Sequence, residues 1–164
     1  NILILPGVGS FPEASKLLKK KSLDKKIIEF TQNKNNYLFG ICLGMQLLFN
    51  ESNEFKKTKG LGLIKGKVKS LKYKNKIIRN IGWKKISINS YDKLFSSFNN
   101  KYFYFVHSFA CHPDNKKNNL FISNIKNKNF CTITRHNNII GTQFHPEKSG
   151  KDGLNLLKNL KKLL

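Results

Sequence analysis

The spacing of apolar and polar residues switches between strand and helix periods along the chain, which predicts an α/β fold. Residues 2–5 are an apolar run typical of a buried strand, and residues 6–9 predict a turn. Residues 10–13 resemble a helix start with a capping box and a proline, and the helical pattern that follows is expected to break near Ser22. Residues 37–41 predict the next strand.

The second half of the chain predicts short strands, after a polar, loop-like segment at residues 51–59. A last helix is expected with Asp152 as its cap. Its predicted apolar face consists of Leu154, Leu157, Leu160 and Leu164. Further strands are expected at 77–88, 102–107, 121–123, 130–134 and 139–144. Because no linker or repeat interrupts this pattern, we expect one domain over residues 1–164, built on a doubly wound, largely parallel sheet.

Composition narrows the class of protein. A chain of 164 residues with 39% hydrophobic and 12% aromatic residues can bury a core and is not disordered. No apolar run approaches the roughly 20 residues that span a bilayer, and no secretory signal pattern is visible. Three cysteines are an odd number, which argues against a disulfide framework, so we expect no membrane association and a cytoplasmic location.

The net charge of +22 could indicate binding to nucleic acid or to an acidic membrane. However, only Arg79 and Arg135 carry a guanidinium, and the lysines are spread from Lys16 to Lys162. We therefore favour a compositional bias and do not expect a nucleic-acid partner. The chain starts at Asn1 within a strand pattern, from which we expect that an N-terminal piece is absent.

Residues 38–48 carry the strongest chemical signal. An apolar run leads into Gly-x-Cys-x-Gly around Cys42, and residues 45–49 are expected to open a helix. This layout is typical of a nucleophile elbow, in which flanking glycines leave room for a tight strand–turn–helix. A cysteine at a helix N-terminus is expected to favour the thiolate. The structural alternative is a small buried cysteine.

A second segment, about 100 residues further on, supplies the partners that a cysteine nucleophile needs. His145 could take and return a proton, and a bend at Pro146 could turn the Glu147 carboxylate onto the imidazole. We therefore predict a Cys42–His145–Glu147 triad. The backbone N–H of Leu43 and the glycine turn at residues 7–9 are candidate donors for an oxyanion hole.

Other residues carry weaker signals. Cys111-His112 and Cys131 with His136 could suggest zinc, but the spacing lacks paired ligands, so we predict no metal site. His107 could line a site or be a hydrogen-bonded structural histidine.

With these motifs in place, the chain resembles the class I (triad) glutamine amidotransferases, through residues 40–46 and 145–147. More narrowly, it resembles the family of glutaminase subunits of imidazole glycerol phosphate synthases. Residues 5–11, 60–64, 82–83, 104–108 and 145–149 carry this narrower resemblance. The resemblance covers nearly the whole chain and implies a flavodoxin-like three-layer α/β/α fold.

The resemblance also implies a reaction: glutamine is hydrolysed through a Cys42 thioester, without a cofactor, and ammonia passes to a (β/α)₈ barrel cyclase subunit. That partner would form imidazole glycerol phosphate for histidine synthesis. The family's roles carry over to residues that match its motifs. Substrate contacts would be Gln46, Ser108 and Phe109, the oxyanion segment Gly7, Val8 and Gly9, and the partner surface Trp83, Tyr104 and Lys148.

The sequence departs from that family at two places. A first strand–helix unit that the family normally has is missing, and Lys84 stands where the family usually has asparagine. Two alternatives therefore remain: a paralogous glutaminase that supplies ammonia for amidation of a surface-glycan sugar, and an inactive, truncated subunit that acts as a binding module. A cysteine peptidase is less favoured, because Gln46 and the turn at residues 6–9 fit glutamine better.

Overall fold

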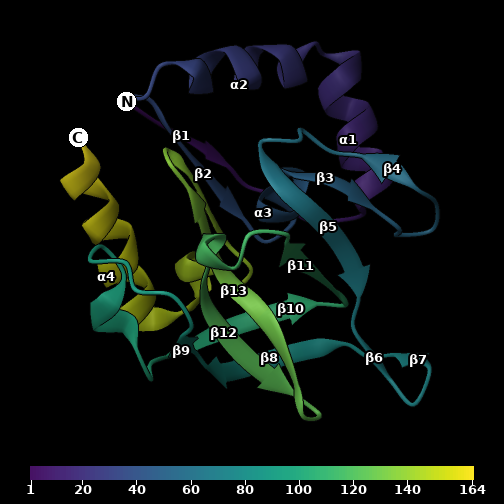
Figure 1. The fold of residues 1–164 in the computed structure, drawn as a ribbon, viewed down its shortest axis with the longest axis vertical. Helices are drawn as coiled ribbons and strands as arrows, with labels where there is room; N and C mark the ends of the chain where they lie inside the picture. The colour runs from purple at the N-terminus through teal and green to yellow at the C-terminus, as the bar shows by residue number, and fades with distance from the viewer.

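The computed structural model describes all 164 residues, and its centre is a six-stranded sheet (Figure 1). In spatial order the strands are β1 (Ile2–Leu5), β2 (Tyr37–Ile41), β14 (Ile139–Thr142), β13 (Lys128–His136), β12 (Asn119–Ile125) and β9 (Ser87–Ile88). β1, β2 and β14 pair in parallel, whereas β13, β12 and β9 pair antiparallel. The largely parallel sheet that we expected is therefore limited to three strands, and the sheet as a whole is mixed.

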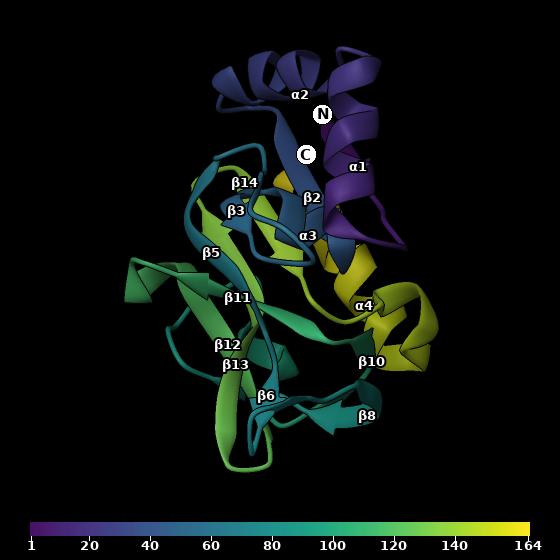
Figure 2. The ribbon, with the colours of Figure 1, turned by 90° about the vertical axis from the view of Figure 1, so that its right-hand side faces the viewer.

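Helices cover both faces of this sheet (Figure 2). The helices are α1 (Phe11–Lys20), α2 (Leu23–Gln32), α3 (Leu43–Leu47) and α4 (Gly150–Leu160). Neighbouring residues of β2 point to opposite faces, so Leu38 joins the core cluster with α1, α2 and α3, while Phe39 joins the cluster with α4. The α/β prediction is confirmed, and the helix–sheet–helix layering follows from this alternation.

Smaller sheets extend the core beside α3. The four-stranded sheet contains β11 (Phe109–Pro113), β5 (Ile64–Ser70), β3 (Phe49–Ser52) and β4 (Thr58–Lys59). Two two-stranded ribbons are β10 (Tyr102–His107) with β8 (Asn80–Lys85), and β6 (Lys72–Tyr73) with β7 (Lys76–Ile77). Short 3₁₀ turns lie at Ser96–Phe98, Lys116–Asn118, Pro146–Lys148 and Lys161–Leu163. β10 passes beside the sheet end from which the site is built, because the backbone N–H of His145 donates to the carbonyl of Tyr104 (3.0 Å).

Several expected local elements form as predicted. The strand at residues 37–41 has the predicted bounds, and Ser22, with φ of 53°, breaks the first helical stretch into α1 and α2.

The predicted capping box does not form, because the Ser10 hydroxyl donates to Glu13 and makes no bond to the helix backbone. In the edge strand β1, Ile4 is 51% exposed, whereas Ile2, Leu3 and Leu5 are half-buried and pack against the core, so the expected burial of residues 2–5 is wrong for Ile4.

Other expectations for local elements are also wrong. The loop-like stretch at residues 51–59 contains the end of β3 and all of β4, and the helix after the elbow ends at Leu47 because Phe49 already begins β3. Of the face predicted for α4, Leu160 is buried and Leu157 packs against the core, but Leu154 is 52% exposed. Leu164 lies beyond the helix and is 77% exposed, and the fully buried Leu156 was not predicted. The predicted face is therefore right only in part, and the expected cap is wrong, because the helix begins after Ser149, three residues before Asp152.

Candidate active site

Cys42 lies in a strained turn between β2 and α3. Its φ of 53° and ψ of −107° are outside the regions that residues with a Cβ normally adopt. Gly44 permits this turn, because a Cβ at Gly44 would lie 1.8 Å from the carbonyl oxygen of Leu5. A Cβ at Gly40 would lie 2.7 Å from the backbone of Gly44. The elbow predicted from Gly-x-Cys-x-Gly is thus present, and both glycines are required by close backbone contacts.

His145 and Glu147 form a hydrogen-bonded pair. The Nδ1 atom of His145 lies 2.7 Å from Oε1 of Glu147, across the 3₁₀ turn Pro146–Lys148. A carboxylate only accepts, so Nδ1 carries the proton and Nε2 is left as an acceptor. His145 is 3% exposed and its Nε2 has no hydrogen-bond partner in the protein. The bend that we predicted at Pro146 therefore turns the Glu147 carboxylate onto Nδ1 and leaves Nε2 without a partner in the protein.

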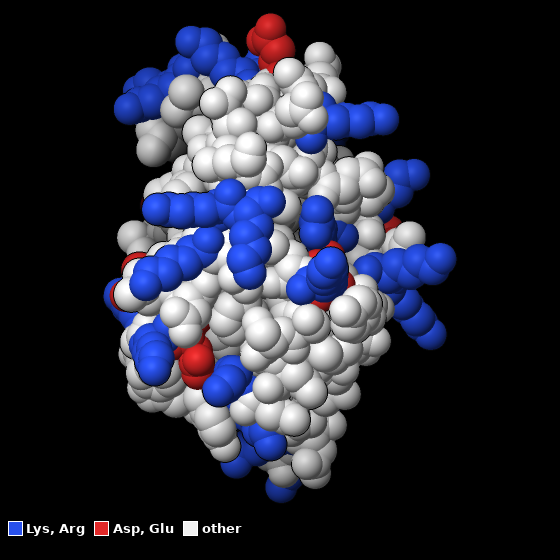
Figure 3. Space-filling view, turned by 90° about the vertical axis from the view of Figure 1, so that its left-hand side faces the viewer, with Lys and Arg blue, Asp and Glu red and all other residues white.

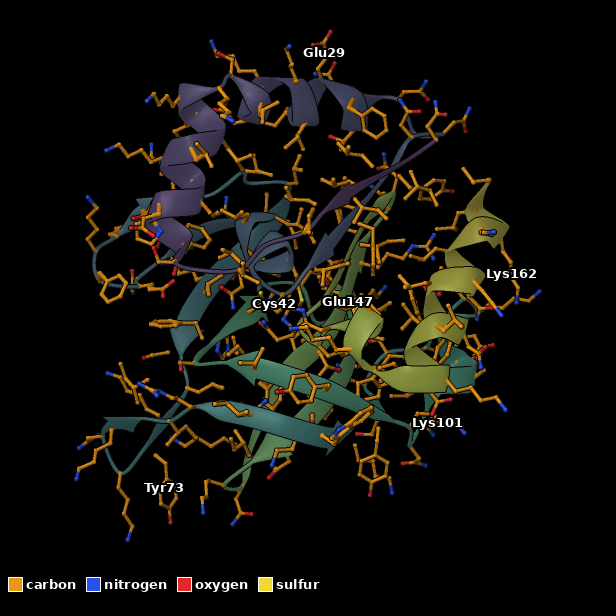
Figure 4. All side chains as sticks on the ribbon, turned by 180° about the vertical axis from the view of Figure 1, so that it is seen from behind. Glu29, Cys42, Tyr73, Lys101, Glu147 and Lys162 are labelled. Carbon is orange, nitrogen blue, oxygen red and sulfur yellow. The ribbon has the colours of Figure 1, made fainter.

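Cys42 and His145 line the same cleft, which has a volume of about 1090 Å³. Figure 4 shows Cys42 and Glu147 near the centre of the molecule, between the small sheets and α4. Of the predicted substrate and oxyanion residues, Gly7 alone does not line the cleft. Those that do are Val8, Gly9, Leu43, Gln46, Ser108 and Phe109. A Cβ on Gly7 would lie 3.0 Å from the backbone nitrogen of Gly44, so Gly7 packs directly against the elbow.

The Cys42 thiol is not activated in this state. Burial raises its pKa to about 11, against lowering contributions from the backbone N–H of Leu43 and the side chain of Gln143. The thiolate that we expected from the helix N-terminus is therefore wrong for this state, because α3 has only five residues and desolvation dominates. The only acceptor within reach of the thiol is the carbonyl oxygen of Val106, at 4.0 Å.

His107 lines the cleft as a structural histidine. Its Nδ1 donates to the carbonyl of Phe109 (2.8 Å), and its Nε2 accepts from the side-chain amide of Asn80 (2.8 Å). Burial, with a smaller contribution from His145, lowers the pKa of His107 to about 4. Both ring nitrogens are therefore occupied, which leaves His107 no role as a base.

Several polar residues at the site were not predicted from the sequence, and Gln143 and Glu54 are the most informative of them. Gln143 is fully buried, and its Nε2 lies 3.9 Å from the sulfur of Cys42. Glu54 lines the cleft and accepts a hydrogen bond from the backbone N–H of Phe11 (2.8 Å). Gln143 lies two residues before His145 in the same motif, and that proximity was the available signal. Glu54 lay in a stretch that we had treated as an ordinary loop.

The predicted partner residues surround an exposed apolar face of the ribbon β8–β10. Trp83 is 53% exposed, is paired in register with Tyr104, and packs edge-on against it with ring centroids 6.2 Å apart. Ile81 and Val106 are cross-strand partners and are 58% and 39% exposed. Lys148 is exposed in the turn just before Gly150, which lies near the Trp83 ring. These side chains form a face that we call the docking face.

The structure shows no cluster of metal-binding side chains, and the basic side chains on one face of the molecule are scattered (Figure 3). No group of three histidine, cysteine or acidic side chains is arranged to hold a metal ion. Cys111 and Cys131 are buried free thiols whose pKa values are raised by burial. Figure 3 shows lysine and arginine side chains spread over the whole of one face of the molecule. No helix is long and apolar enough to cross a membrane.

Comparison with known proteins agrees with this geometry. The family described as "Glutamine amidotransferase class-I" matches residues 1–162. The chain resembles solved structures such as PurLQS from Thermotoga maritima, with a TM-score of 0.73, 18% identity and coverage of 99% of this chain and 80% of that one. A structure described as a glutamine amidotransferase has a TM-score of 0.70 at 16% identity, over 99% of this chain and 78% of that one. The chain belongs to the class I glutamine amidotransferases.

Curated relatives narrow this class. The imidazole glycerol phosphate synthase subunit HisH of Pyrococcus furiosus is 43% identical over 98% of this chain and 81% of its own length. The protein of the same name from Chlorobium luteolum is 39% identical over 96% of this chain and 78% of its own length. Within its class, the chain therefore belongs to the family of these HisH subunits.

Proposed function

We propose that this chain is the glutaminase subunit of an imidazole glycerol phosphate synthase. It hydrolyses glutamine to glutamate and supplies ammonia to a cyclase subunit in histidine synthesis. One observation supports the hydrolysis of glutamine. Glu147 binds Nδ1 of His145, which leaves the buried Nε2 without a partner, and His145 lines the same cleft as Cys42. The choice of a histidine-pathway cyclase as the acceptor of ammonia is supported by the 43% identical relative, a subunit of imidazole glycerol phosphate synthase.

The reaction follows from these positions. Sγ of Cys42 attacks the side-chain carbonyl of glutamine while its proton moves to Nε2 of His145. The backbone N–H of Leu43 and the turn at residues 7–9 stabilise the oxyanion. His145 then gives the proton to the departing nitrogen. The nitrogen leaves as ammonia, and the glutamyl group stays on Cys42 as a thioester. Water, deprotonated by His145, cleaves the thioester to glutamate and restores the thiol.

The cleft offers complementary groups for the glutamine zwitterion. Glu54 provides a carboxylate for the ammonium group, and Lys69 and Arg79 on the rim provide positive charge for the carboxylate. Gln46 and residues 108–109 line the same cleft and would fix the extended side chain. Both charged groups on the α-carbon of glutamine would therefore have a partner of opposite charge.

The docking face includes side chains of β10, the strand whose backbone lies next to Cys42 and His145. The Val106 carbonyl lies 4.0 Å from the Cys42 sulfur, and the Tyr104 carbonyl accepts from the backbone N–H of His145, while both side chains belong to the docking face. We propose that a (β/α)₈ barrel cyclase covers this face and that ammonia reaches it by passing alongside β10. An exposed tryptophan beside a tyrosine is typical of an interface anchor. Three free, buried thiols fit a reducing cytoplasm.

The experiment is glutamate release from glutamine, with and without the cyclase subunit and an analogue of its nucleotide substrate. We expect strong stimulation by the pair, because burial raises the pKa of the Cys42 thiol in the chain alone. Trp83→Ala should lower the apparent affinity for the cyclase at least tenfold. The matched control is Tyr91→Ala, which removes an exposed aromatic that lines a separate hollow together with Arg135. Glutaminase activity that the cyclase does not stimulate would refute the histidine-pathway assignment and favour the sugar-amidation paralogue.

A further inference from the structure

We propose that Gln143 is a further catalytic residue: its side-chain amide donates a hydrogen bond to the Cys42 sulfur and stabilises the thiolate during attack, and Gln46 sets the orientation of that amide. This inference rests on the proposed glutaminase function for its catalytic meaning. The hydrogen-bond geometry on which it stands does not depend on that function.

Gln143 is held rigidly next to the nucleophile. It follows β14 directly, its backbone N–H donates to the carbonyl of Thr132 (2.9 Å), and its side chain is fully buried. Nε2 lies 3.9 Å from Sγ of Cys42, and Oε1 lies 3.3 Å from Nε2 of Gln46. The backbone N–H of Cys42 is itself bonded to the carbonyl of Thr142 (2.7 Å), the residue before Gln143. A backbone hydrogen bond therefore fixes the segment that carries the Gln143 amide next to the residue that carries the sulfur.

The surrounding bonds decide which end of the Gln143 amide faces the sulfur. The carbonyl of Phe109 can only accept, so the Gln46 atom 3.0 Å from it must be the NH₂ group. That NH₂ group also points at Gln143, so the Gln143 atom opposite must be its oxygen. The NH₂ group of Gln143 is then the end that faces Cys42. Because His107 also donates to Phe109, this carbonyl is fixed from two sides.

The Gln143 amide lies where it can offset the groups that disfavour the Cys42 thiolate. Burial raises the pKa of the Cys42 thiol, and the negative charge of Glu147 raises it further. The Gln143 side chain acts in the opposite direction and lowers it. A neutral amide can stabilise the developing thiolate without adding a charge that would compete for the Glu147 carboxylate. The bond is long in this state and would shorten as the sulfur gains charge.

The same network limits what Gln46 can offer to substrate. Both protons of its NH₂ group are committed, one to Phe109 and one to Gln143. Its remaining Oε1 is an acceptor, which suits the N–H groups of glutamine. Gln46 thus links substrate contact to the orientation of the donor at the nucleophile.

The test measures the pH dependence of Cys42 alkylation by iodoacetamide in the folded chain, which requires neither glutamine nor a partner. Cys111 and Cys131 are almost fully buried, and Cys42→Ser gives their background rate. Gln143→Met keeps the length of the side chain and removes the donor. We expect the midpoint of its alkylation curve to rise by about one pH unit, so that the rate below the midpoint falls about tenfold. Gln46→Met, which releases the Gln143 amide, should shift the midpoint in the same direction by a smaller amount.

The control is Ser123→Ala, which removes another buried hydrogen bond, from the Ser123 hydroxyl to the Lys85 carbonyl (2.7 Å). If Gln143 only fills space, Gln143→Met and Ser123→Ala will have the same alkylation curve as the wild type, and the proposal is wrong. If urea unfolding shows that Gln143→Met is not folded, Gln46→Met decides in the same way. In the glutaminase assay Gln143→Met should lower kcat much more than it raises KM. An inactive wild type would remove the proposed function while leaving the alkylation result intact.

Discussion

Replacing His107 with asparagine should make the stability of this protein less sensitive to acid. In the folded state burial lowers the pKa of His107 to about 4, from 6.5 for an unperturbed histidine. Burial disfavours the charged ring, and the neutral ring satisfies both bonds, since its Nδ1–H donates to the Phe109 carbonyl and its Nε2 accepts from Asn80. The unfolded chain has no such restraint and protonates near the ordinary value. Acid therefore favours the unfolded state through this one side chain.

The size of the effect follows from the two pKa values. Each unit of difference corresponds to about 1.4 kcal/mol, so the limiting loss is roughly 3 kcal/mol. The stability from a neutral His107 is complete above about pH 6.5 and declines as the pH falls toward the folded-state pKa of about 4. At about pH 4.5 the loss should reach about 2.5 kcal/mol. This is a large fraction of the 5–15 kcal/mol that is typical of a domain.

Urea unfolding at about pH 7.5 and pH 4.5 measures this difference for wild type and His107→Asn. Asparagine keeps a donor for the Phe109 carbonyl but cannot titrate, so the variant should lose about 2.5 kcal/mol less than the wild type between these pH values. His136→Asn, which replaces an exposed histidine, should behave as the wild type does. Equal losses in wild type and His107→Asn would refute the assignment of a buried, neutral histidine.

Two further substitutions test the frame of the site. Gly44→Ala should destabilise the protein by more than about 3 kcal/mol in urea unfolding, because the new methyl group would lie 1.8 Å from the Leu5 carbonyl; a stable variant would contradict the elbow geometry. Ser149→Ala should cost about 1–3 kcal/mol and lower glutaminase activity, because the hydroxyl donates to the carbonyl of His145 (2.6 Å) in a buried position. Ser96→Ala, which loses one exposed bond, should be nearly neutral, and equal effects of the two serine variants would count against the positioning role.

Local sequence patterns were sufficient to predict the reactive parts of the site. The glycines around Cys42 imply a tight turn because only a residue without a Cβ allows the contacts of Gly44 and Gly40. The pairing of His145 with Glu147 follows from a two-residue spacing across a proline. In each case the chemistry is encoded within about five consecutive residues. The catalytic roles themselves stay predictions until activity is measured.

Features that depend on contacts between distant segments could not be predicted. The hydrogen bonds that define His107 and Gln143 join residues that lie up to 101 positions apart in the sequence. The buried face of α4 was predicted only in part, because four leucines permit more than one helical stripe, and packing against the sheet selects Leu156 and Leu160. The ionisation of Cys42 was also misjudged, since burial depends on the whole fold and outweighs the short helix.

The most direct test of the central claim is the release of glutamate from glutamine by the wild type and by Cys42→Ser, each with the cyclase subunit present. The account predicts steady glutamate formation by the wild type, a glutamyl adduct on Cys42 detectable by mass spectrometry after rapid quenching, and neither product with Cys42→Ser. Glutamate formation that persists in Cys42→Ser would contradict the assignment of Cys42 as the nucleophile. A wild type without activity in the presence of the cyclase would contradict the glutaminase assignment itself.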